Sequence, residues 1–181
     1  MTAALLLGAQ AIVPISRAAP DVLLRSVCFE DRVALPAKEF RDIAYSELPR
    51  EARVAFNRVV PGFIPDRMVR EIGSPLGAAQ VPNRILARQA INELFLILPR
   101  PDAAGLAART CAVAWKGRLS DAGSFIGDTF SGVGTTPVQG LSGQLQVLRT
   151  VADGAELTAA EYSGWSVIAV TPQTDRIGQK G

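Results

Sequence analysis

The sequence predicts an α+β domain with N-terminal strands, a central helical segment and C-terminal strands in a mixed or antiparallel sheet. Segments of strand character lie at both ends of the chain, and segments with a helical apolar period lie between them. Strands and helices do not alternate, as they would in a parallel α/β sheet. Because 181 residues are enough to bury a substantial core, we expect a single domain over residues 1–181.

The first 15 residues are strongly apolar. They match the apolar part of a signal peptide in length, but the first basic residue is Arg17 and no clear cleavage site follows. We therefore expect a retained N-terminal arm, with residues 11–15 as a strand, that lies against a neighbouring subunit or against its own core. Residues 22–29 are predicted to form a second strand. The residues expected to anchor the arm are Leu5, Leu6, Leu7, Ile12 and Val13.

Prolines mark the starts of three short predicted helices, because proline is well suited to the first helical position. These helices cover residues 36–48, 49–60 and 65–72. Pro61 and Gly62 end the second helix, and Gly73 is a suitable C-cap for the third.

The longest helical period covers residues 83–98, which we expect to form the central helix. Asn83 is a candidate N-cap, and Pro99 ends the run. Residues 94–98 are apolar all round, so the last turn should be buried on every side. The apolar face consists of Ile85, Leu86, Ala90, Ile91, Leu94, Phe95 and Leu98.

The C-terminal part contains three predicted strands, at residues 110–115, 144–151 and 165–171, which are β-branched, aromatic or alternating in pattern. Between the first two, residues 120–143 are rich in Gly, Ser and Thr and are expected to form a long loop. Thr158 and Glu161 have the spacing of a capping box for a single helical turn.

The residue types available exclude several kinds of site. The chain has no histidine, which removes the commonest general base and the commonest zinc ligand. Cys28 and Cys111 are too few for a four-ligand metal site; they could pair, but we expect free buried thiols in a reducing compartment. The loop at 127–137 lacks the Lys of a phosphate loop and the third Gly of a dinucleotide turn. Asp121 and Asp128 lack the alternating oxygens of a calcium loop.

Arginines form the most notable polar pattern. Three pairs are spaced three or four residues apart on predicted helices, so each pair should point from one side of its helix. Guanidinium groups bind phosphate well, although acidic residues nearby would also pair with them. The pairs are Arg50 and Arg53, Arg67 and Arg70, and Arg84 and Arg88.

These features predict a non-enzymatic structural subunit of a large symmetric assembly, for which we favour a capsid, tail or connector component of a virus or phage particle. The alternative is a small Arg-lined binding module for nucleic acid or a phosphorylated ligand. The net charge of +2 indicates no strong polyelectrolyte character. We expect partners to be copies of the chain or other subunits, and no cofactor, metal or transmembrane segment. The expected location is a virion assembled in a host cytoplasm, or otherwise the cytoplasm.

Overall fold

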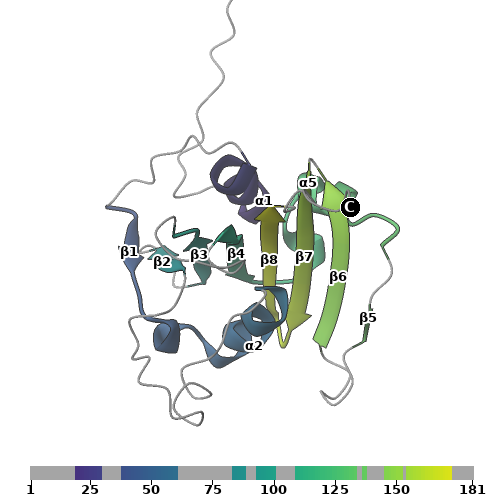
Figure 1. Ribbon diagram of the computed structural model, residues 1–181. Coiled ribbons are helices and arrows are strands. Elements are labelled where there is room, and N and C mark those ends of the chain that lie inside the picture. Colours follow the sequence, from purple (N-terminus) through teal and green to yellow (C-terminus); the bar gives the residue numbers. More distant parts are fainter. Residues whose placement is uncertain are drawn as a thin grey trace, which may run out of the picture.

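The computed structural model (Figure 1) describes the chain in eight stretches. They cover residues 19–29, 38–60, 83–88, 93–100, 109–133, 136–137, 145–152 and 154–172, with only the backbone described for 136–137. All structural statements below refer to these stretches.

An antiparallel sheet organises the fold, with the strand order β1-β2-β3-β4-β8-β7-β6-β5. Two-residue connections join β6 to β7 and β7 to β8, whereas the helix α2 (Arg50–Val59) lies in the chain between β1 and β2. The contact between β4 and β8 joins strands β1 to β4 and strands β5 to β8 into one sheet. The strands are β1 (Phe40–Asp42), β2 (Arg84–Arg88), β3 (Leu94–Leu98), β4 (Cys111–Lys116), β5 (Thr136–Pro137), β6 (Leu145–Ala152), β7 (Ala155–Tyr162) and β8 (Trp165–Pro172).

Helices cover both faces of the sheet (Figure 1), and each face has its own apolar core. On one face the helix α2 (Arg50–Val59) packs over β7 and β8 through residues such as Phe56. The opposite face is covered by α1 (Pro20–Leu24), which continues into one turn of π-helix (Arg25–Phe29), and by α5 (Ser124–Thr129). Successive side chains of a strand therefore enter different cores, and β3, β4 and β8 are buried almost throughout.

The predicted central helix over 83–98 is wrong, because this segment forms the antiparallel hairpin of β2 and β3. Ile85 lies opposite Ile97, and Leu86 lies opposite Leu96. Both faces of this hairpin are buried, so residues 85–87 and 94–98 are consecutive apolar residues instead of alternating ones. Such runs cannot be distinguished from a buried helix by their period. Asn83 is not an N-cap; it is buried at the start of β2.

Two N-terminal predictions are also wrong. Residues 22–29 form the helical segment α1 and its π-helical turn instead of a strand. Pro20 in the first turn and Asp21 beside it favour a helix start. Within the predicted helix 36–48, the described residues form the short strand β1 and one turn of 3₁₀ helix (Tyr45–Glu47).

The remaining predictions have mixed outcomes. The helix at 49–60 and the strands at 110–115, 144–151 and 165–171 are confirmed as α2, β4, β6 and β8. The capping box at Thr158 and Glu161 is wrong, since both residues lie inside β7. The expected loop over 120–143 contains the helix α5 and the end of a 3₁₀ turn (Leu119–Asp121). The strand at 11–15 and the helix at 65–72 lie outside the described residues.

Within the described stretches, helices are all too short or too polar to cross a membrane.

Candidate functional site

Of the two arginine pairs that the structure describes, the pair Arg50 and Arg53 lies on a helix, α2, as predicted. Arg50 begins the helix and is exposed. The guanidinium of Arg53 lies 6.0 Å from the ring centre of Tyr45, whose hydroxyl donates a 2.8 Å hydrogen bond to Oδ1 of Asn57. Arg53 is therefore held against the aromatic side chain that anchors the 3₁₀ turn, while Arg50 extends into solvent.

The pair Arg84 and Arg88 lies on strand β2, where neither residue forms an open anion site. Nε and Nη2 of Arg84 donate to the two carboxylate oxygens of Asp42 at 2.6 and 2.7 Å. This bidentate bond lowers the pKa of Asp42 and raises that of Arg84. Arg88 is only 8% exposed, and burial lowers its pKa while the charge of Glu39 opposes the shift.

Several predicted site residues lie outside the described stretches. These are the third arginine pair, Arg67 and Arg70, and the anchoring residues of the arm, Leu5, Leu6, Leu7, Ile12 and Val13. The structure therefore brings together no common surface for the three arginine pairs among the residues that it describes.

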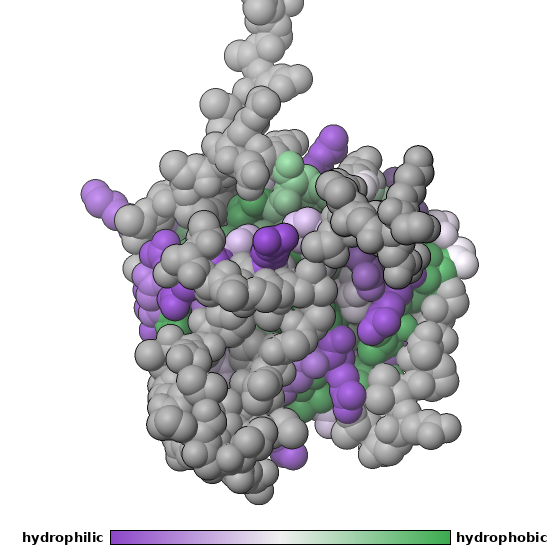
Figure 2. Space-filling model, in the orientation of Figure 1, coloured by the Kyte–Doolittle hydropathy of each residue, from purple (hydrophilic) through white to green (hydrophobic). Residues whose placement is uncertain are grey.

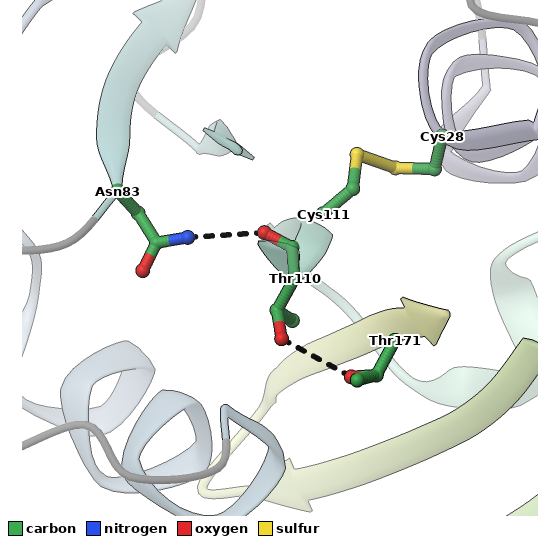
Figure 3. The surroundings of a disulfide bond; sticks show 5 residues. All are labelled: Cys28, Asn83, Thr110, Cys111 and Thr171. Carbon is green, nitrogen blue, oxygen red and sulfur yellow. Dashed lines mark hydrogen bonds between the residues drawn. A yellow bond between two sulfur atoms is a disulfide. The ribbon is translucent and has the colours of Figure 1, made fainter. Parts of the chain in front are cut away.

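The two cysteines form a disulfide, which corrects the expectation of free thiols (Figure 3). Cys28 lies in the π-helical turn after α1, and Cys111 is the first residue of β4. The bond joins residues 83 positions apart and fixes the N-terminal helical segment to the centre of the sheet. Because both sulfurs are consumed, neither cysteine can act as a nucleophile in this state.

A small buried polar cluster lies beside the disulfide (Figure 3). Asn83 donates from Nδ2 to the carbonyl oxygen of Thr110 at 3.0 Å, and the hydroxyls of Thr110 and Thr171 lie 3.1 Å apart. Asn83 precedes β2, Thr110 precedes β4, and Thr171 is near the end of β8. These bonds therefore tie together three strands at one end of the sheet, which is a structural role.

Acidic residues in the described part of the chain also take structural roles. Asp121 accepts hydrogen bonds from the backbone N–H of Arg118 and the hydroxyl of Ser120, so it shapes a turn. Within the same stretches, no three Cys, Asp or Glu side chains are grouped closely enough to hold a metal ion.

The two edges of the sheet differ in how they are protected. At one edge, β1 has only three residues, and two of them are exposed charges: Arg41 pairs with Glu47 at 3.1 Å, and Asp42 pairs with Arg84. Short, charged edge strands discourage pairing with another chain.

At the other edge, β6 has eight residues. Among the described residues, only Gln146 and Val147 pair with an outer strand, the two-residue β5. We call residues 148–152 the β6 edge. Val151 in this segment is 58% exposed, the highest exposure of any large apolar side chain that the structure describes. Hydrophobic and hydrophilic residues lie side by side on the right of Figure 2, where β6 is seen in Figure 1.

Comparison with protein-family models, with curated proteins and with solved structures finds no match. The candidate site therefore depends on the geometry of this chain alone. On that geometry, the β6 edge is the strongest candidate for an interaction surface.

Reasoning from the sequence missed both the disulfide and the β6 edge. The signal for the disulfide was the even number of cysteines, but pairing across 83 residues depends on the tertiary fold. The alternating pattern of residues 144–151 correctly indicated a half-buried strand. It could not show which strand would lie at the edge of the sheet.

Proposed function

We propose that this protein is a non-enzymatic structural subunit of an assembly built from copies of itself, and we favour a virus or phage particle as that assembly. The observation that carries the proposal is the unequal protection of the two sheet edges. One edge ends in a short charged strand, and the other offers five strand residues with an exposed valine. An edge of this kind is a template for pairing with another polypeptide.

Contacts within the chain also support this proposal, because they occupy several reactive or charged side chains that the structure describes. The cysteines bond to each other, and Lys116 pairs with Glu93 at 2.8 Å. Arg118 lies 3.8 Å from Glu161, which also accepts a hydrogen bond from the backbone N–H of Leu119. These groups stabilise turns and strand ends.

The disulfide changes the expected location. Disulfides persist in oxidising surroundings, which include the surfaces of virions and cells, and they are rare in a reducing cytoplasm. A particle that leaves its host would keep the bond between Cys28 and Cys111 intact. The proposal therefore places the working protein outside the cytoplasm, in the finished particle.

Sedimentation velocity on the purified full-length chain, over a wide concentration range and without reductant, tests the proposal. We expect species much larger than the 19.2 kDa protomer, and negative-stain electron microscopy should show them as uniform particles or rings. A chain that sediments as a monomer at every concentration would rule out the assembly.

A second candidate function is an Arg-lined binding module for nucleic acid or a phosphorylated ligand. It is favoured by one observation, the exposed Arg50 in the first turn of a ten-residue helix, with Arg53 three residues further on. Replacing both by alanine should weaken retention on single-stranded DNA and flatten its dependence on salt. Wild-type protein that fails to bind at low salt would exclude this function.

A further inference from the structure

We propose that the β6 edge pairs with the same edge of a second copy, antiparallel and about a two-fold axis at Thr150. This inference rests on the proposed function, since it identifies one of the surfaces through which copies of the chain associate. It would join two sheets into one continuous sheet across the interface. Four observations support it: the direction of the backbone groups, the available register, the side chains of the exposed face and the position of β5.

The hairpin of β6 and β7 determines which backbone groups face outward. Two residues connect the strands, and Ala152 lies opposite Ala155 as the closing pair. In a two-residue hairpin the closing pair exchanges two hydrogen bonds, so Ala152 and every second residue before it bond to β7. The N–H and C=O groups of Arg149 and Val151 therefore point away from the sheet.

The pairing with β5 is consistent with this assignment. Thr136 lies opposite Val147, which should also have outward-facing groups. Pro137 lies opposite Gln146, where no outward hydrogen bond is made and the missing N–H of proline costs nothing. In the part of the chain that the structure describes, β5 thus uses the outward groups of Val147 and leaves those of Arg149 and Val151 for another strand.

A two-fold axis at Thr150 uses both outward-facing residues of each copy. It places Arg149 opposite Val151 of the second copy, and Val151 opposite the second Arg149. Each of these two pairs can exchange two hydrogen bonds, since directly opposed residues of this type form the hydrogen-bonded pairs of an antiparallel ladder. An axis at Arg149 would place Val151 opposite Val147, which already pairs with β5. An axis at Val151 would place Arg149 opposite residue 153, which lies beyond the end of β6.

Side chains on the α2 face of the sheet are complementary in this register. Val151 lies beside Glu156 within the chain, and Arg149 lies beside Thr158. Across the interface the row becomes Glu156, Val151, then Arg149 of the second copy. The aliphatic part of that arginine would cover the exposed valine, and its guanidinium would extend toward the carboxylate of Glu156, two strands or roughly 10 Å away between backbones.

The other face adds no unfavourable contact. Thr150 lies opposite its own copy, a pair that is common between neighbouring strands, and Leu148 lies opposite Ala152. Leu148 and Ala152 are half-buried in the core of their own chain and would be covered further. β5 ends the contact at residue 147, so the interface is confined to the β6 edge.

Charge reversal tests the side-chain arrangement by sedimentation velocity on the full chain. Arg149→Glu would face Glu156 of the second copy, and we expect the dissociation constant to rise at least about tenfold. Combining it with Glu156→Arg should restore association, because the row keeps opposite charges. Arg58→Glu, an exposed change of the same sign on α2, is the control and should leave association unchanged.

Cross-linking tests the position of the axis independently. Thr150→Cys would place two thiols at a non-hydrogen-bonded pair, where the Cα atoms are about 4.5 Å apart and a disulfide can form. We expect a covalent dimer on a non-reducing gel, while Val22→Cys, which is exposed on α1, should not cross-link. Val151→Pro should also weaken association without unfolding the protein, because it removes only an outward N–H.

The outcomes separate the two proposals. If the wild type associates but Thr150→Cys does not cross-link and the charge reversals leave its mass unchanged, the β6 edge is not the interface, although the proposed assembly stands. If the wild type is a monomer throughout, both proposals fail. Cross-linking of Thr150→Cys together with rescue by the double charge reversal would establish the interface.

Discussion

Gly123 lies directly against the carboxylate of Asp21, and a side chain at Gly123 would collide with it. Asp21 is 8% exposed, and its backbone N–H donates to the carbonyl oxygen of Ala122 at 3.2 Å. The start of α1 is thereby fastened to the turn that precedes α5, which is distant in the sequence. Gly123 also has φ 125° and ψ 172°, a conformation that is almost confined to glycine.

Replacing Gly123 by alanine should therefore destabilise the protein. Backbone strain alone should lower the free energy of unfolding by about 1–3 kcal/mol, and the collision with Asp21 adds to this. Urea denaturation followed by circular dichroism measures the change. The matched control is Gly127→Ala inside α5, where a Cβ would meet no neighbouring atom. This control should be neutral or stabilise by up to about 1 kcal/mol, and equal effects at the two positions would contradict the packing described.

Reduction of the disulfide should cost about 2–4 kcal/mol of unfolding free energy, because the bond closes a long loop of the unfolded chain. Denaturation with and without dithiothreitol measures the loss. The variant with both Cys28→Ala and Cys111→Ala should be as unstable as the reduced protein and insensitive to the reductant. Two titratable thiols in unreduced, unfolded wild-type protein would show that the bond does not form.

Strand β3 should be sensitive to truncation on both of its faces. Leu94 and Ile97 are buried in different cores, and replacing either by alanine should cost about 2–5 kcal/mol. The control Gln146→Ala is at an exposed position of β6 and should change stability by less than about 0.5 kcal/mol. A small effect at one of the two β3 positions would mean that only one face of the strand is covered.

The ion pair of Asp42 and Arg84 should contribute to stability in a pH-dependent way. Because the hydrogen bond from Arg84 lowers the pKa of Asp42, the folded state binds its proton more weakly than the unfolded state does. The contribution is therefore present above the ordinary carboxyl range and is lost as pH falls below about 4. The pair is exposed, so the difference between wild type and Asp42→Asn should be under about 1 kcal/mol at pH 7.

Unfolding of both proteins at pH 7 and at pH 2 to 3 checks this prediction. The stability difference should shrink at the lower pH and also in about 1 M salt, which screens surface charges. A difference that stays constant across this range would mean that the carboxylate charge contributes nothing.

Local patterns were sufficient for several elements. The proline at residue 49 and the apolar stripe that follows it correctly predicted α2. The β-branched run from Trp165 and the alternation before Val151 correctly predicted β8 and β6. In these segments local preference and final environment agree, so the period of the apolar residues identifies the element.

The segment from Asn83 to Leu98 shows where local information was insufficient. Its apolar residues fit a helical period as well as a buried hairpin, and only the cores on the two faces of the sheet select the hairpin. The candidate site was even harder to infer from the sequence. Arg84 and Arg88 became contacts within the chain because β2 placed them beside Asp42 and Glu39.

The sequence by itself determined which segments could be buried, that the chain has no histidine, and that the regions around α2, β6 and β8 would be regular. Only the tertiary structure decided that Cys28 meets Cys111, that Asp21 meets Gly123 and that β6 lies at the edge of the sheet. The physical reason is the same in each case. Such relationships join residues far apart in the sequence, and the order of strands in a sheet is set by the total burial of both faces, which no single segment encodes.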